Sequence, residues 1–177
     1  MRYTLATDAA AIAYRLVQTV PELEHIKSAR IAWLFTLDEL KLGGGQKAAI
    51  ISTPTVQGNL RKLFEWFLDE MTAELFDGDA ADFLVRVSVG AWESIDAIRR
   101  ERLVFHELCH LVHAEDRYGA PLFDDEGRPA LKLVPHDTEV FHEEIRRYGV
   151  EVVGLKEHVA AIEEGERRER VRAFKTA

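Results

Sequence analysis

The most distinctive stretch of this sequence places two histidines four residues apart, with a glutamate directly after the first: His106, Glu107 and His110. Residues four apart share one face of an α-helix, so both imidazoles can reach a single metal ion. A carboxylate at the edge of that face can hold a metal-bound water and accept its proton. This is the spacing of the HExxH motif, in which two histidines bind zinc and the glutamate acts as general base.

The helix that carries the motif is predicted to span residues 95–114, with Ser94 as its N-cap. Apolar residues occupy the arc opposite the two histidines. They are Val104, Phe105, Leu108, Leu111 and Val112. The pattern therefore predicts a helix with one buried side and one side available for a metal site.

Two other potential ligands near the motif are not expected to bind the same metal. His113 would lie about 10 Å along the helix from His106, too far for one ion. Cys109 would point about 100° away from His110, and a buried packing role is the favoured interpretation.

A third ligand is expected from a separate element, because a catalytic zinc takes three protein ligands and keeps one position for water. After an irregular loop at 115–135, the candidates are His136, Glu139, His142 and Glu143. His136 and Glu139 lie about one helical turn apart and share roughly one face. Whichever does not bind zinc is well placed to orient a ligand, and Asp137 could hold a ligand imidazole in one tautomer. His142 lies off that face and is expected to be exposed.

The remaining pattern predicts a small α+β fold. Helices are expected at residues 7–19, 59–76 and 136–148, and strands at 29–37, 48–53 and 82–89. The first two strands flank a glycine run and are expected to form a hairpin. The third strand alternates apolar and polar residues, which fits an edge strand or one beside a cleft; an ordinary solvated face explains it as well. The apolar stripe of the helix at 59–76 is expected to pack in the core.

Composition and charge limit the class of the 177-residue chain. Its net charge of −8 argues against a broad nucleic-acid or anionic-membrane surface. Its single cysteine excludes an intrachain disulfide and fits a reducing compartment. No apolar run approaches the roughly 20 residues of a membrane helix, and the N-terminal stretch lacks a signal-peptide pattern. A soluble cytoplasmic protein is therefore expected, with one domain over residues 1–150 and a charged helix or tail at 151–177.

Three segments carry a family resemblance. His-Glu-Leu-Cys-His at 106–110, His-Asp-Thr-Glu-Val-Phe at 136–141 and Arg-Arg-Tyr-Gly at 146–149 resemble the putative phage metallopeptidase family, small zincin-like proteins of phages and prophages. The resemblance covers roughly residues 7–150. The family is similar in turn to the SprT/Spartan-like and WLM-like minimal zinc peptidases. These have an HExxH helix and a later histidine in a His-Gly/Asn-x-x-Phe segment.

The resemblance implies one zinc ion on His106, His110 and His136, with Glu107 as general base. This sequence departs from the later segment in two ways, because Asp137 follows the histidine and the phenylalanine comes one place later. These departures keep Glu139 as an alternative third ligand.

The sequence thus favours a zinc-dependent peptidase that acts on a peptide or protein. A donor to the oxyanion is also required, and Tyr148 or Arg146 could serve. The main alternative is a catalytically silent zinc-binding regulatory or interaction module of phage or prophage origin, which would close the fourth metal position with a protein ligand. Proteolysis linked to DNA, as in Spartan, is disfavoured by the acidic balance.

Overall fold

A computed structural model describes residues 3–42, 45–54, 61–135, 141–156, 159–160, 162–163 and 166–167. The chain divides into two compact units, Met1–Pro135 and His136–Ala177. Among the described residues, no helix is long and apolar enough to cross a membrane. Helices and short sheets are combined in an α+β architecture, as the sequence predicts.

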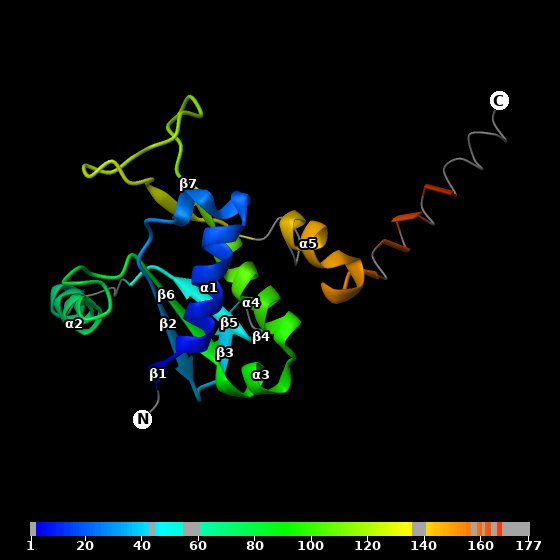
Figure 1. The fold of residues 1–177 in the computed structure, drawn as a ribbon, viewed down its shortest axis with the longest axis horizontal. Coiled ribbons are helices and arrows are strands. Elements are labelled where there is room, and N and C mark those ends of the chain that lie inside the picture. The colour runs from blue at the N-terminus through cyan, green and yellow to red at the C-terminus, as the bar shows by residue number, and fades with distance from the viewer. Residues whose placement is uncertain are drawn as a thin grey trace. The chain divides into compact units, whose positions relative to one another are not determined.

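Among the described residues, the first unit is built on a four-stranded sheet with the order β1-β2-β6-β5 (Figure 1). The strands are β1 (Tyr3–Leu5), β2 (Ile31–Thr36), β5 (Ala49–Ser52) and β6 (Phe83–Ser88). The central strands β2 and β6 run parallel, whereas β1 and β5 pair antiparallel at the two edges.

The predicted hairpin between residues 29–37 and 48–53 is wrong, because β6 lies between β2 and β5. The glycine run instead joins a smaller hairpin of β3 (Leu40–Leu42) and β4 (Gly45–Lys47). The interpretation of residues 82–89 as an edge strand is also wrong. The alternation in β6 reflects two faces of unequal burial in a central strand, and β5 is the edge.

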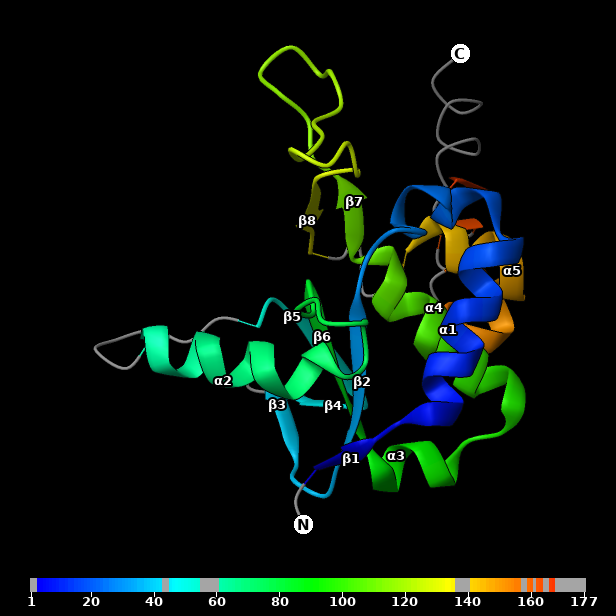
Figure 2. The same cartoon turned by 60° about the vertical axis from the view of Figure 1, so that its left-hand side comes forward.

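Helices α1 (Thr7–Thr19) and α4 (Ala97–Cys109) pack against each other and cover one face of the sheet (Figures 1 and 2). The predicted helix at 7–19 is confirmed in full. The predicted apolar back of the motif helix is confirmed too, since Val104, Phe105 and Leu108 are almost completely buried. The chain between α1 and the sheet forms a 3₁₀ helix, η1 (Pro21–Ile26), which packs against both α1 and the strand that follows α4.

The helix α2 (Arg61–Ala73) corresponds to the one predicted at 59–76, but part of its apolar stripe is exposed. Leu63 and Met71 are each 57% exposed, so the expected core packing does not hold for these side chains. The periodicity identifies an amphipathic helix, whereas it does not reveal whether another element covers the stripe.

The helix predicted at 95–114 is shorter than expected and is followed by a strand. A short helix, α3 (Val89–Ser94), precedes α4, and the N-cap of α4 is Asp96 rather than Ser94. The Asp96 carboxylate accepts the backbone N–H of Arg99 at 2.8 Å. Helix α4 ends at Cys109, and residues Leu111–His113 form strand β7.

Strand β7 pairs antiparallel with β8 (Leu131–Leu133), and residues 114–130 between them form a projecting arm (Figure 2). In the second unit, α5 (His142–Val152) contains a break at Gly149, whose φ of 74° ends the regular helix where the sequence predicts. The described part of this helix begins at its N-cap, Phe141, and residues 136–140 lie outside the described part of the chain.

Candidate metal centre

His106 and His110 face each other at the C-terminal end of α4. Their ring centroids lie 5.3 Å apart, with the ring planes at 84°. His110 is the C-cap but keeps helical dihedral angles (φ −68°, ψ −17°), so the four-residue spacing still brings both rings to one side. Two imidazoles on a tetrahedral zinc, with Zn–N bonds of about 2.0–2.1 Å, have centroids about 5 Å apart. The observed pair fits a shared zinc ion.

The ring of His110 is held in the tautomer that suits a metal ligand. Its Nδ1 lies 2.6 Å from the carbonyl oxygen of Val134, which can only accept a hydrogen bond. Nδ1 therefore carries the proton, and the lone pair of the neutral ring is on Nε2. Ligand histidines in zinc sites characteristically donate their other N–H in this way.

This hydrogen bond also continues the β7–β8 ladder by one step. The Val134 N–H donates to the carbonyl of His110 at 2.9 Å, as in an antiparallel pair. The reciprocal donor would be the backbone N–H of His110, but that group is used by the helix and bonds Glu107 at 3.3 Å. The imidazole N–H of His110 takes its place toward Val134. The end of the helix and the start of the hairpin thus fix one side chain together.

Glu107 is only 4% exposed. Carboxylates are rarely buried to this extent, because transfer of a charge out of water is costly unless it is compensated. Buried acidic groups concentrate at functional sites. Its position next to His106 and its burial both suit a general base.

The remaining predicted site residues are only partly described. His136, Asp137 and Glu139 lie outside the described residues, so their contribution to the site stays a prediction. Within the described part of the chain, no group of three or more histidine, cysteine, aspartate or glutamate side chains is placed to hold a metal. Tyr148 lies in the second unit, where the guanidinium of Arg147 is 5.7 Å from its ring centroid.

His113 lies on β7 rather than on the motif helix. Its Nε2 donates to the carbonyl of Leu122 at 2.8 Å, and its ring packs edge-on against Phe123. Both contacts tie β7 to the arm, and the expected distance along one helix does not apply to His113 because α4 ends at Cys109. Cys109 is half-buried, and His142 is exposed as predicted.

The arm contains a short repeat, and neither the repeat nor its structural role was deduced from the sequence. The pattern Asp-x-x-Gly-x-Pro occurs at 116–121 and again at 124–129. In each copy the aspartate accepts backbone N–H groups two and four residues later. Asp followed by Gly in this arrangement is a readable turn signal. The loop predicted as irregular is therefore made of two consecutive aspartate-capped turns.

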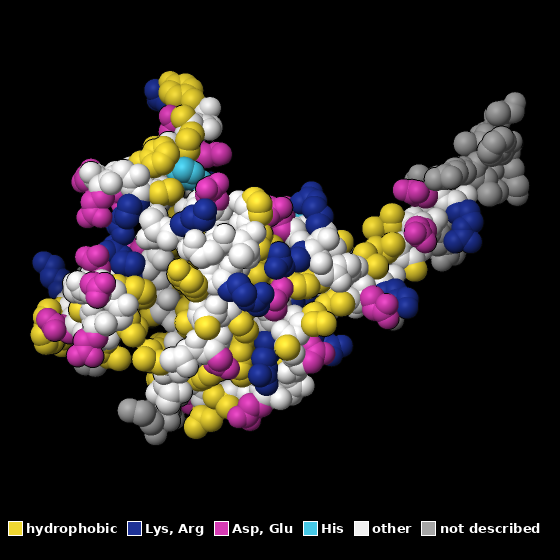
Figure 3. All heavy atoms as spheres, viewed as in Figure 1, with side chains coloured by type: hydrophobic (Ala, Val, Ile, Leu, Met, Phe, Trp, Pro, Cys, Tyr) yellow, Lys and Arg dark blue, Asp and Glu magenta, His cyan; other side chains and the backbone are white. Residues whose placement is uncertain are grey.

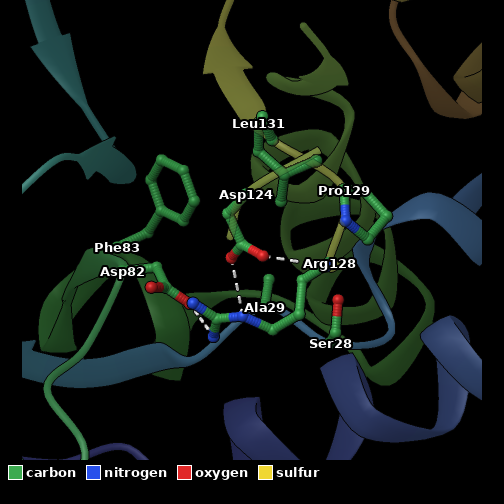
Figure 4. Close-up of a pocket in the computed structure, with 9 residues that line it drawn as sticks. Ser28, Ala29, Asp82, Phe83, Asp124, Arg128, Pro129 and Leu131 are labelled. Carbon is green, nitrogen blue, oxygen red and sulfur yellow. Dashed lines mark hydrogen bonds and ion pairs between the residues drawn. The ribbon is translucent and has the colours of Figure 1, made fainter. Parts of the chain in front are cut away.

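A small pocket of about 160 Å³ lies where the arm meets the beginnings of β2 and β6 (Figure 4). Arg128 lies between two carboxylates there, with its Nε 2.8 Å from Asp124 and its Nη1 3.9 Å from Asp82. The backbone N–H of Arg128 lowers the pKa of Asp124, and desolvation opposes that shift. The described residues that line this pocket include no member of the HExxH motif.

Charges of both signs are interspersed on the face shown in Figure 3. Several acidic and basic side chains pair locally, among them Arg15 with Glu101 and Arg99 with Asp96. This distribution agrees with the net charge of −8 and gives no support to a nucleic-acid surface on that face.

The comparisons with known proteins found one family. No curated protein and no solved structure matches the chain. The family model described as "Putative phage metallopeptidase" matches residues 1–163, which include the HExxH motif and the segment at 136–141. The chain therefore belongs to the putative phage metallopeptidase family.

Proposed function

We propose that this protein is a zinc-dependent peptidase of the HExxH type. The observation that carries the proposal is the His106–His110 pair, with the Nδ1–H of His110 donated to the Val134 carbonyl. Ligand histidines in zinc sites usually donate their other ring N–H to a carbonyl or carboxylate, and the His110 ring makes this contact beside a second imidazole. Family membership supports a metallopeptidase in general, and the donor set of two imidazoles favours zinc.

The proposed third ligand is His136. It follows Val134 by two residues, and two residues span at most about 7 Å. The short covalent connection is compatible with a ligand at position 136 for a metal held by His110. Glu139 is the alternative ligand, and Asp137 is the proposed partner of a ligand imidazole.

In the proposed reaction, bound zinc would polarise the scissile carbonyl and lower the pKa of a water molecule. Glu107 would accept the proton of the attacking water and pass it to the leaving amine. The buried position of this carboxylate would keep competing water away from the proton transfer. Tyr148 or Arg146 would donate to the oxyanion.

Metal content tests the ligand set. Elemental analysis would compare the wild type with His110→Ala, His136→Ala and Glu139→Ala, and His113→Ala is the matched control. We expect about one zinc per chain in the wild type and the control. We expect zinc to be lost from His110→Ala and His136→Ala and kept in Glu139→Ala. If zinc is lost from Glu139→Ala and kept in His136→Ala, the glutamate is the third ligand. A wild type that takes up no zinc would refute the proposal.

The catalytic role of Glu107 needs a separate assay. Glu107→Gln should keep zinc but cleave an unfolded protein such as reduced casein at least about 100-fold more slowly, because a general base typically contributes 10²–10⁴-fold. Full activity in the zinc-loaded variant would rule out this mechanism. A zinc-loaded wild type with a fourth protein ligand and no cleavage would favour the alternative, a zinc-binding regulatory or interaction module.

A further inference from the structure

His25, on η1, makes a hydrogen bond next to the proposed metal site. Its Nε2 lies 2.8 Å from the carbonyl oxygen of Leu111, the residue that directly follows His110. A carbonyl can only accept, so Nε2 donates. The histidine is half-buried, and Leu111 is 1% exposed.

This contact covers the edge of β7 that faces away from β8. In an antiparallel pair, successive residues direct their backbone groups to alternate sides. The carbonyl of His110 bonds Val134 on the β8 side, and the next carbonyl, that of Leu111, bonds His25. Because Leu111 is buried, its carbonyl would lack a partner of this kind without the ring.

We propose that His25 is a positioning residue for the metal site, an inference that rests on the proposed function. The ring fixes the peptide group after His110 from the η1 side, while β8 fixes His110 from the other side. Together they set the position of the His110 imidazole before metal binds. Without the His25 hydrogen bond, β7 can shift relative to β8, and the Nδ1 contact to Val134 that orients the ligand weakens.

The chain offers a matched control for this contact. His113, on the same short strand, also donates from Nε2 to a backbone carbonyl at 2.8 Å, but its partner is Leu122 in the arm. His113→Ala therefore removes a hydrogen bond of the same kind and length from the same hairpin. It does so without touching the peptide group next to the ligand.

The experiment measures zinc affinity in the full chain by chelator competition, together with the visible absorption of the Co²⁺-substituted protein, which reports ligand geometry. We expect His25→Ala to weaken zinc binding about tenfold, at the low end of the 10–100-fold range for residues that orient ligands. Its cobalt spectrum should also change. We expect His113→Ala to stay within about threefold of the wild type, with an unchanged spectrum.

Two conservative variants keep the test decisive if His25→Ala does not fold. A glutamine amide nitrogen lies about as far from Cα as Nε2 does, whereas an asparagine amide reaches only to the depth of Nδ1. We expect His25→Gln to have the zinc affinity and cobalt spectrum of the wild type. We expect His25→Asn to bind zinc more weakly and to have a changed cobalt spectrum, as His25→Ala does.

The outcomes separate the two proposals. A wild type that binds zinc, with His25→Ala equal to it in affinity and spectrum, overturns the role of His25 and leaves the proposed function intact. Equal losses in His25→Ala and His113→Ala would show a general weakening of the hairpin and would also overturn it. A wild type that binds no metal overturns both.

Discussion

Replacing Asp82 with alanine is expected to destabilise the first unit substantially. The Asp82 carboxylate accepts the backbone N–H of Arg30 at 2.8 Å and its guanidinium at 3.1 and 3.4 Å. In return, the Arg30 carbonyl accepts the backbone N–H groups of Asp82 and Phe83 at 2.8 and 3.1 Å. These contacts join the two chain segments directly before the parallel β2–β6 pair, whose first paired residues are Ile31 and Phe83. Asp82 is also the largest cause of the raised pKa of Arg30.

The magnitude follows from the number of hydrogen bonds and their exposure. A hydrogen bond to a charged group contributes about 1.5–3 kcal/mol, and water replaces part of this where the group is accessible. The side chains of Arg30 and Asp82 are 20% and 30% exposed. We therefore expect Asp82→Ala to lower the free energy of unfolding by about 2 kcal/mol. Asp82→Asn keeps an oxygen acceptor but loses the charge, and it should cost about half as much.

Urea unfolding followed by circular dichroism would measure these differences. At roughly 2–4 °C per kcal/mol for a domain of this size, Asp82→Ala should also lower the melting temperature by about 4–8 °C. Glu24→Ala is the control, because its ion pair with Lys27 is exposed and should contribute at most about 1 kcal/mol. A loss below about 0.5 kcal/mol in Asp82→Ala, or one no larger than in the control, would refute the reasoning.

Three further predictions concern single contacts. Asp124 has a folded-state pKa below its ordinary value of 3.8, so its ionised form contributes stability above that pH, which is lost as the pH falls through the lowered pKa. Below about pH 4, the melting temperature of Asp124→Asn should therefore fall less steeply with decreasing pH than that of the wild type. The same pH dependence in both proteins would contradict this. Asp8→Ala should cost about 1–3 kcal/mol in urea unfolding, because Asp8 accepts the indole N–H of Trp92, a ring only 4% exposed; Asp8→Asn should recover most of the loss. Gly149→Ala should cost about 1–3 kcal/mol, because φ 74° with ψ 162° is accessible almost only to glycine. Among the described residues, no atom lies within 4 Å of the added Cβ, so steric overlap is not the expected cause. An unchanged free energy of unfolding would show that the backbone of α5 at residue 149 can adopt another conformation without cost.

Local patterns predicted the helices well and the strand pairing poorly. Helix α1 and the motif helix have apolar stripes, and this signal lies within a few residues of sequence. The caps were predicted less well, because α1 has no side-chain cap and α4 is capped by Asp96 rather than Ser94. The partner of a strand is a non-local property, however. β2 pairs with β6, about 50 residues later, through a parallel connection that no turn signal marks. The glycine run was expected to join residues 29–37 to 48–53 in one hairpin, but the strands on its two sides that pair are β3 and β4.

The side chains of the proposed site could be predicted from the sequence, whereas the backbone groups that contact them could not. The HExxH spacing predicted that His106 and His110 lie on one side of a helix, and their rings do face each other. The hydrogen-bond partner of His110 is a backbone carbonyl, that of Val134, and any residue type supplies such a group. The same holds for the Leu111 carbonyl that bonds His25. Spacing therefore indicates candidate ligands, whereas the backbone groups that orient them are found only in the structure.

The early end of α4 connects the fold to the proposed chemistry. If the helix ran to residue 114, as its apolar stripe suggests, the carbonyl of His110 would accept the N–H of residue 114 rather than that of Val134. The β7–β8 hairpin would then have no register that brings the Val134 carbonyl to the imidazole, and nothing in this ladder would select the Nδ1–H tautomer. Because the helix ends at Cys109, the second histidine of the motif directly precedes strand β7 and joins the hairpin ladder. One turn of helix thus sets the spacing of the two histidines, and the hairpin sets the orientation of the second. This division predicts that a change in the pairing of His110 with Val134 alters metal affinity even when the HExxH sequence is intact.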